Sequence, residues 1–456
     1  MYAHRYLSLN SSSTDISTNE ERLGWRYSRR SLVVSTIFMD FIRADPFIDF
    51  HPSSKELSRD ITRHNHSSSK TRISGIHRMT TMPGSTSACD TINQLPSNVM
   101  ENILMRLPQK DAIRTSILSS KWRYKWLALP QLVFDCPRDY KLDVSERIKL
   151  AFAVYQALLL HRGPLFRFSF SVSELENCSD INHWLHFLSE NDIEDFTFRV
   201  WTGEHYKLPC HLYSFQQLRH LNLYNCAFKP PSTFKGFDRL VSLEFRKVLF
   251  AAERFGIFIS NCPLLERMAL EGCPHFYCLR ISAPNLKCLS FCRTFDSINL
   301  KNTPLLENLS ISMNGIPETA KYLRDRKTSN LIEIVSSVPA VEKLSAEQHF
   351  LKANTKTEAA MEPVLEYMRV QDFSDCSLNR LREVKMQLIS GVQSELEFMK
   401  LLLAKSTMLE KLEILPTKEN STNGGFQILR ELIRFRRASA KAEIIYLDPD
   451  LDGFSF

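Results

Sequence analysis

Apolar residues recur with one spacing through the middle of the chain. The pattern Leu-x-x-Leu-x-Leu-x-x-Cys begins at Leu218 and again, with Met in its second place, at Leu265. Shorter copies begin at Leu240 and Leu286, and a copy that ends in Asn begins at Leu306. The first positions of successive copies are 22, 25, 21 and 20 residues apart. The alternation inside each copy predicts a short strand with two apolar side chains on one face.

A repeat of this length predicts a coil of stacked turns. Periods of about 20–29 residues with this pattern are typical of leucine-rich repeats. One turn cannot bury its apolar side chains alone, so neighbouring turns must stack and their strands form one sheet. We expect the Cys or Asn after each strand to hydrogen-bond backbone groups where the chain leaves the sheet. Weaker copies extend the coil in both directions, at Ile193/Phe196/Phe198, Val341/Leu344, Leu381/Val384/Met386 and Leu409/Leu412/Ile414.

Other elements are predicted around the repeats from the same periodicities. Helices are expected over 144–161, 181–189, 395–405 and 427–434, strands over 165–172, 193–200 and 442–447, and an insertion that contains helix over 346–377.

Three short amphipathic helices are predicted between residues 95 and 130. Pro96 stands in a first turn, where its missing N–H is harmless, and Pro108 ends that helix. Trp122 and Trp126 give the third helix its apolar side, and Pro130 closes it. A module of about 45 residues has too little core to cover all of these side chains. The remaining apolar surface should therefore meet a partner or the protein's own repeats.

Composition narrows the class of protein. The formal net charge is +7, but the first 89 residues hold twelve Lys and Arg against eight Asp and Glu, which leaves only +3 for the rest. This disfavours a nucleic-acid-binding protein, which usually has a clustered basic face. Eleven scattered cysteines favour a reducing compartment, the cytosol or the nucleus. The sequence has no run of about 18 apolar residues, so no membrane span is predicted. None of the common catalytic motifs is found in it.

Residues 90–135 resemble the F-box of the plant F-box/leucine-rich-repeat/FBD proteins. The matching features are Leu95-Pro96, Ile103-Leu104, Leu107-Pro108, Lys110-Asp111, Arg114-Thr115, Leu118-Ser119, Trp122-Arg123, Trp126 and Phe134-Asp135. Residues 158–170 resemble the joint between F-box and repeats in that family, and 378–447 resemble its C-terminal FBD domain. Two positions depart from the family pattern. Lys125 stands where an apolar residue is usual, and Ala440 where a proline is frequent.

The resemblance implies an α/β fold: a three-helix F-box, then a leucine-rich-repeat solenoid (horseshoe) that ends in an FBD α/β cap. The expected domains are a disordered extension (1–88), the F-box (89–137), the repeats (138–377) and the FBD domain (378–449). In this family the F-box binds a Skp-type adaptor, and through it a cullin and a RING subunit. Carried over to this chain, the adaptor-facing residues are Leu95, Pro96, Ile103, Leu104, Leu107, Pro108, Ala112, Leu118, Ser119 and Trp122. The chain would then be a non-catalytic substrate receptor of an SCF-type ubiquitin ligase.

The target protein should bind the open face of the sheet, where the side chains between the buried leucines point. The candidate substrate-binding residues are His220, Asn222, Tyr224, Glu244, Arg246, Arg267, Glu271 and Asn308. Charges of both signs with an aromatic suit a protein-binding surface, although a simple solvated face remains the alternative for any one of them. Neither nucleic acid nor membrane is expected as a partner.

Three alternatives remain open from the sequence. Cys273, His275, Cys278, Cys288 and Cys292 lie close together, but their spacing is not the paired C-x2-C of common zinc sites. No metal and no cofactor are therefore expected. An enzyme is disfavoured by the missing motifs. A leucine-rich-repeat protein that binds proteins or senses a ligand outside a ubiquitin ligase is the remaining alternative.

Overall fold

The computed structural model describes residues 94–107, 109–175, 178, 180–274, 278–292, 297–312, 334–335, 337–347, 378–417 and 423–448. The predicted extension over 1–88 lies outside these residues, as does the predicted insertion over 346–377 except its first two positions. The chain divides into two compact units. Unit 1 contains the chain up to Ala128 together with Asp143–Arg162, and unit 2 contains Leu129–Leu142 together with everything from Gly163 on.

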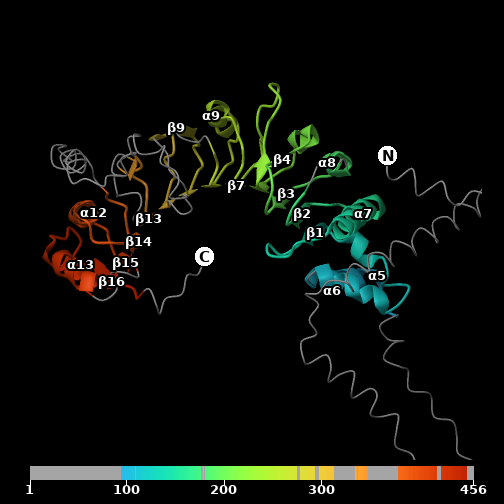
Figure 1. The fold of residues 1–456 in the computed structure, drawn as a ribbon, viewed down its shortest axis with the longest axis horizontal. Coiled ribbons are helices and arrows are strands. Elements are labelled where there is room, and N and C mark those ends of the chain that lie inside the picture. Colours follow the sequence, from blue (N-terminus) through green and yellow to red (C-terminus); the bar gives the residue numbers. More distant parts are fainter. Residues whose placement is uncertain are drawn as a thin grey trace, which may run out of the picture. The chain divides into compact units, whose positions relative to one another are not determined.

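Unit 1 is helical (Figure 1). Its described elements are α5 (Ser97–Arg106), α6 (Gln109–Arg114), the 3-10 helices η1 (Thr115–Ile117) and η2 (Lys125–Ala128), and α7 (Val144–Leu160). Of the three predicted short helices, the third is only the 3-10 turn η2. The chain between η1 and η2 forms turns. The Ser116 hydroxyl links the two ends of this segment by donating a hydrogen bond to the Arg123 carbonyl at 2.9 Å. Met100, Leu104, Ala112, Trp122 and Trp126 form the core of this unit.

The helix predicted over 144–161 is present as α7, and a capping box fixes where it begins. The Asp143 carboxylate accepts from the Glu146 N–H at 2.7 Å, and the Glu146 carboxylate accepts from the Asp143 N–H at 2.9 Å. These two bonds satisfy N–H groups that have no partner inside a helix, so they define the helix start.

Unit 2 is built on one sheet of twelve strands, all parallel and in sequence order (Figure 1). The strands are β1 (Gln131–Asp135), β2 (Arg167–Val172), β3 (Asp195–Val200), β5 (His220–Tyr224), β7 (Ser242–Arg246), β8 (Arg267–Glu271), β10 (Cys288–Cys292), β12 (Asn308–Ser312), β13 (Lys343–Glu347), β14 (Glu383–Ile389), β15 (Lys411–Pro416) and β16 (Glu443–Tyr446). Every predicted repeat strand is present. The α/β class with its repeat solenoid is therefore confirmed.

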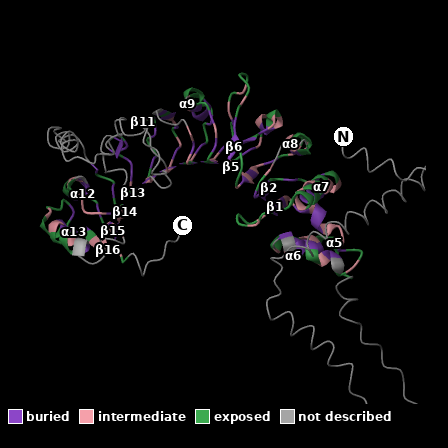
Figure 2. Cartoon of the chain, in the orientation of Figure 1, coloured by how far each residue is buried: buried purple, intermediate pink, exposed green. Residues whose placement is uncertain are grey.

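The register of the sheet places equivalent repeat positions side by side. Leu221 pairs with Leu243, which pairs with Met268, and the same alignment continues along the sheet. These side chains are buried, and from β5 to β15 most of those between them are more exposed, so this part of the sheet has a buried and an open face (Figure 2). In β2 and β3 the intervening Ser169, Ser171 and Thr197 are buried as well. In the first turns the buried positions are aromatic: Phe168 stacks on Phe196 with ring centroids 6.1 Å apart, and Phe170 stacks on Phe198 at 5.5 Å.

Helices and smaller sheets complete the turns of unit 2. The described helices are α8 (Asp180–Ser189), η3 (Cys210–Ser214), α9 (Ala252–Ser260), α12 (Gln393–Lys405) and α13 (Asn423–Arg434). Two short sheets pair β4 (Tyr206–Lys207) with β6 (Cys226–Ala227), and β9 (Cys278–Ser282) with β11 (Ser297–Lys301). The helix α9 and these short sheets were not predicted.

The cysteine of the repeat acts as predicted in two turns. The Cys226 thiol donates to the Tyr224 carbonyl at 3.3 Å, and the Cys273 thiol donates to the Phe245 carbonyl at 3.4 Å. Both thiols are buried, so they satisfy carbonyls at the ends of strands where water has no access. Asn314, the predicted equivalent, lies outside the described residues.

A buried carboxylate organises the start of α12. Glu395 has no exposed surface and accepts from the N–H groups of Ser390, Gly391 and Val392 at 2.9, 2.7 and 3.3 Å. Gly391 has φ +80°, and a Cβ there would lie 2.8 Å from a side-chain carbon of Ile428. The turn therefore needs both glycine and the carboxylate.

Candidate functional site

The candidate adaptor-facing residues of unit 1 are only partly accessible. Pro96, Ile103 and Leu118 are exposed, and Leu95, Leu107 and Ser119 are half-buried. Ile103 and Leu118 expose 38% and 49% of their surface, which is high for apolar side chains. These residues are the part of the candidate set that can contact another protein directly.

Three residues of the same set lie inside unit 1. Leu104, Ala112 and Trp122 are at most 2% exposed, so they support the surface and do not form it. Pro108 lies outside the described residues. The sequence pattern could not separate these buried residues from the exposed ones. Packing in the core of unit 1 and contact with an adaptor both require apolar residues, and the F-box pattern gives only the residue type at each position.

Unit 1 exposes other apolar residues as well. Val99 and Met105 of α5 expose 36% and 49% of their surface. The helix α7 has a longer stripe on one side, which consists of Val144, Ile148, Phe152, Tyr155 and Leu159. Their spacing of three or four residues places them on one helix face. This stripe could have been found from the sequence, because α7 is apolar on more than one side.

Lys125, one of the two departures from the family pattern, has a local partner. Its ammonium lies 3.1 Å from the Glu101 carboxylate of α5, and both side chains are partly exposed. A charged residue is therefore accommodated here without a buried unpaired charge, as expected for a lysine whose stem packs while its end reaches water.

The candidate substrate residues lie on the open face of unit 2, in rows that cross the strands. His220, Arg267 and Asn308 belong to one row, since each takes the first position of its strand. Asn222 and Glu244 are neighbours in the second row, and Arg246 and Glu271 are neighbours in the third. The sheet therefore brings these residues onto one surface.

Polar contacts join several of these residues. The Arg246 guanidinium lies 2.6 Å from the Glu244 carboxylate and 3.2 Å from that of Glu271. Glu244 also accepts from the Asn222 amide, and Asn222 accepts from Arg199 at 3.4 Å. The result is a polar network across β3, β5, β7 and β8.

Tyr224 differs from the other candidates because its side chain is buried. Its ring centroid lies 5.0 Å from that of Trp201, and the Lys247 ammonium lies 5.5 Å above the ring. Burial, reinforced by the Lys247 charge, lowers the pKa of the neighbouring His205. Tyr224 is thus held by contacts within the protein at the edge of the candidate surface, and Lys247 beside it is exposed.

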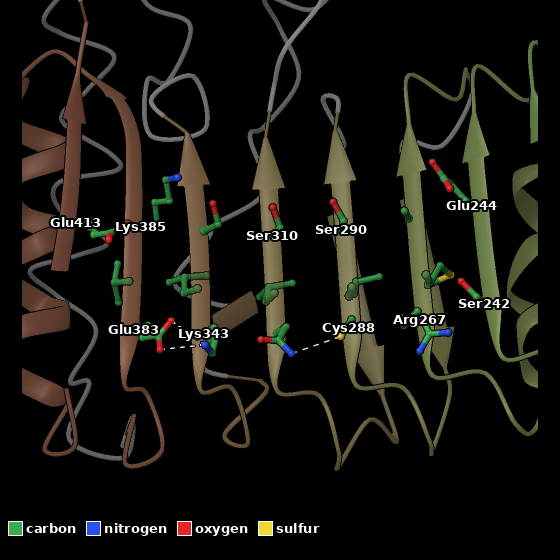
Figure 3. Close-up of a pocket in the computed structure, with 18 of the residues that line it drawn as sticks. Ser242, Glu244, Arg267, Cys288, Ser290, Ser310, Lys343, Glu383, Lys385 and Glu413 are labelled. Atoms are coloured by element: carbon green, nitrogen blue, oxygen red, sulfur yellow. Dashed lines mark hydrogen bonds and ion pairs between the residues drawn. The ribbon is translucent and has the colours of Figure 1, made fainter. Parts of the chain in front are cut away.

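A hollow of about 580 Å³ lies on the open face between β7 and β15 (Figure 3). Of the candidate residues, Glu244, Arg267 and Asn308 line it. Serines occupy its middle, and charged side chains of both signs lie around it. Among the residues that sequence reasoning did not select, Lys343, Lys385 and Glu383 contribute to the same hollow.

The cysteine-rich segment gives no metal centre within the described residues. No group of three or more His, Cys, Asp or Glu side chains there is arranged to hold an ion. Cys273 is used in the sheet, and Cys288 accepts from the Asn308 amide at 3.4 Å. His275 lies outside the described residues, and the side chain of Cys278 is not described.

Comparisons with known proteins assign both units. A family model for the F-box domain matches residues 92–131, and one described as the At1g61320/AtMIF1 LRR domain matches residues 165–318. An Arabidopsis thaliana F-box/FBD/LRR-repeat protein, At1g13570, is 34% identical over 413 residues, which cover 78% of this chain and 98% of that protein. The chain belongs to the F-box/FBD/LRR-repeat proteins. A second Arabidopsis thaliana protein of this name, At5g56420, is 25% identical and aligns over 56% of this chain and 65% of its own length.

For this F-box/FBD/LRR-repeat protein, the matches place the exposed apolar residues of α5, and Leu118, in the F-box, and they place the polar network across β3 to β8 in the repeats. None of the helices in the described part of the chain is both long and apolar enough to cross a membrane.

Proposed function

We propose that this protein is the substrate receptor of an SCF-type ubiquitin ligase. Its F-box binds a Skp-type adaptor, which carries a cullin and a RING subunit, and its repeats bind the protein to be ubiquitinated. The observation that carries this proposal is the exposed apolar side of α5 in the F-box, made by Pro96, Val99 and Ile103 at spacings of three and four residues, together with exposed Leu118. A monomeric soluble protein rarely leaves such a group exposed without a partner.

The chain itself needs no catalytic group for this role. A receptor that holds a target close to a ubiquitin-charged enzyme raises the local concentration of reactant, which is enough to accelerate transfer. The polar network on the sheet face and the nearby hollow supply a surface for the target. The scattered cysteines suit a place of action in the cytosol or the nucleus.

The test is assembly of the full-length protein with purified Skp-type adaptor and cullin. The wild type should retain adaptor, and cullin should follow only when adaptor is present. The double variant Leu95→Ala with Pro96→Ala should lose both adaptor and cullin, because it removes the two apolar side chains that stand directly before α5.

A matched control is available in unit 2, where Pro263 and Leu264 form an exposed pair of the same residue types. Pro263→Ala with Leu264→Ala should leave assembly unchanged. Adaptor binding that survives the F-box substitutions, in a protein with an unchanged circular dichroism spectrum, refutes the proposed role of this surface.

A further inference from the structure

The hollow on the sheet face has a floor of small side chains. The neighbouring strands β8, β10, β12 and β13 place one residue each in a continuous row, Ala269, Ser290, Ser310 and Ser345. Because these side chains are short, the face lies lower here than beside the longer residues of β7 and β14. The three serine hydroxyls have no hydrogen-bond partner among the described residues. They are therefore available to a bound molecule, as donors or as acceptors.

The charges around this floor are not balanced. The carboxylates that line the hollow each contact a cation, as Glu383–Lys343 at 2.9 Å, Glu244–Arg246 at 2.6 Å and Glu413–Lys411, and Arg246 is shared between Glu244 and Glu271. Arg267 and Lys385 are exposed and have no carboxylate partner within the described part of the chain. The hollow therefore presents two positive charges that contact no carboxylate of the described residues.

These two cations lie at opposite ends of the floor, with Ser290 and Ser310 between them (Figure 3). Arg267 is on β8 and Lys385 on β14, four strand spacings apart. Strands are about 4.8 Å apart, and the two residues are offset by two positions along their strands, so their Cα atoms are separated by about 20 Å. An extended peptide advances about 3.3 Å per residue and covers this distance in about six residues.

We propose that the hollow binds an extended acidic segment of the target protein, with one carboxylate at each end of a seven-residue stretch. The segment crosses β8 to β14, its terminal carboxylates pair with Arg267 and Lys385, and its backbone hydrogen-bonds the serines of the floor. This inference rests on the proposed function, since it gives the chemistry of the target that the repeats recognise.

Other occupants fit the hollow less well. A basic segment would place its charges against two unpaired cations, because every lining carboxylate is already paired. An apolar segment would cover the serine hydroxyls without giving them partners, and burying an unpaired polar group is unfavourable.

The experiment uses full-length protein and pools of seven-residue peptides with degenerate middle positions. Three pools have Glu, Gln or Lys at both the first and the seventh position, and binding is measured by fluorescence anisotropy at low salt. The Glu pool should bind about five- to tenfold more tightly than the Gln pool, as two partly exposed ion pairs can supply. This preference should disappear in the double variant Arg267→Ala with Lys385→Ala.

The control variant removes the same charge elsewhere in unit 2. Lys207 and Arg430 are exposed and belong to no strand of the twelve-stranded sheet, so Lys207→Ala with Arg430→Ala should keep the Glu preference. Equal binding of the Glu and Gln pools, tighter binding of the Lys pool, or equal loss in both variants overturns the inference. Adaptor binding by the Arg267/Lys385 variant is measured in parallel. Normal adaptor binding without a peptide preference refutes only the acidic segment, whereas a peptide preference without adaptor binding refutes only the ligase role.

Discussion

Two exposed residues of the F-box give a quantitative prediction. Ile103 on α5 and Leu118 after η1 are 38% and 49% exposed, and the double variant Ile103→Ala with Leu118→Ala removes most of both side chains. We expect the affinity for a Skp-type adaptor to fall while the F-box remains folded.

The magnitude follows from the area that is still exposed. Complete burial of an Ile or Leu side chain contributes about 1.5–3 kcal/mol. The exposed fractions therefore leave about 0.6–1.1 kcal/mol for Ile103 and about 0.7–1.5 kcal/mol for Leu118 to be gained on binding. Together they amount to about 1.3–2.6 kcal/mol, which corresponds to a Kd raised about 10- to 100-fold.

The assay is isothermal titration of adaptor into the full-length protein, with thermal unfolding of each variant as a check on folding. Ile257→Ala with Leu264→Ala is the matched control, since these residues have the same types and lie in unit 2 with 64% and 49% exposure. Leu104→Ala serves as a comparison in which stability, and not the exposed surface, is changed. It empties a fully buried site and should cost about 2–5 kcal/mol of stability. A Kd that changes less than threefold in the Ile103/Leu118 variant, or equally in the control, would show that this surface does not contact the adaptor.

Two further predictions concern stability and reactivity. Glu395→Ala leaves three backbone N–H groups without their acceptor and should lower the free energy of unfolding by about 3 kcal/mol in urea titrations. Glu397→Ala on the same helix removes only surface contacts with Gln393 and Lys400 and should change the free energy of unfolding by less than about 0.5 kcal/mol, so equal losses would contradict the capping role. Burial raises the pKa of the Cys262 thiol to about 12, so at pH 8 iodoacetamide should modify exposed Cys210 and leave Cys262 unmodified until the protein unfolds. Equal labelling of the two cysteines by mass spectrometry would show that Cys262 is not protected.

The repeat strands could be predicted because their signal is local. Each strand is marked by two apolar residues at alternate positions, and stacking of equivalent turns then fixes the register, as in the alignment of Leu221 with Leu243. The first strand, β1, has apolar Leu132 and Phe134 at alternate positions, but apolar Val133 between them interrupts the alternation with polar residues. It lies within the stretch that resembles the F-box, yet it pairs with β2 residue by residue from Gln131↔Arg167 onwards. Only the position of its partner strand makes it part of the sheet.

The F-box surface shows what an apolar pattern leaves undetermined. Ile103 and Leu104 are adjacent and both apolar, but one is exposed and the other has no exposed surface. Helical periodicity identifies apolar positions without saying which contact the module's own core, because a small module has apolar residues on more than one face. Which face is covered depends on the turns between η1 and η2, where the Ser116 hydroxyl bonds the Arg123 carbonyl. One serine in a sequence is too weak a pattern to predict such turns.

The sheet-face hollow depends on contacts between residues that are distant in sequence. Lys343 and Glu383 are forty residues apart, and their pairing requires β13 to lie directly beside β14. The repeat spacing predicts strands at both places, but it does not say that the strands are neighbours across a long interruption of the pattern. With β13 beside β14, the row of Ser290, Ser310 and Ser345 continues to Lys385. The same neighbour relation lets Glu383 form its ion pair with Lys343. The charge of Lys385, which contacts no carboxylate of the described residues, is thus placed by the folded register, and for that reason the chemistry of the hollow could be inferred only from the structure.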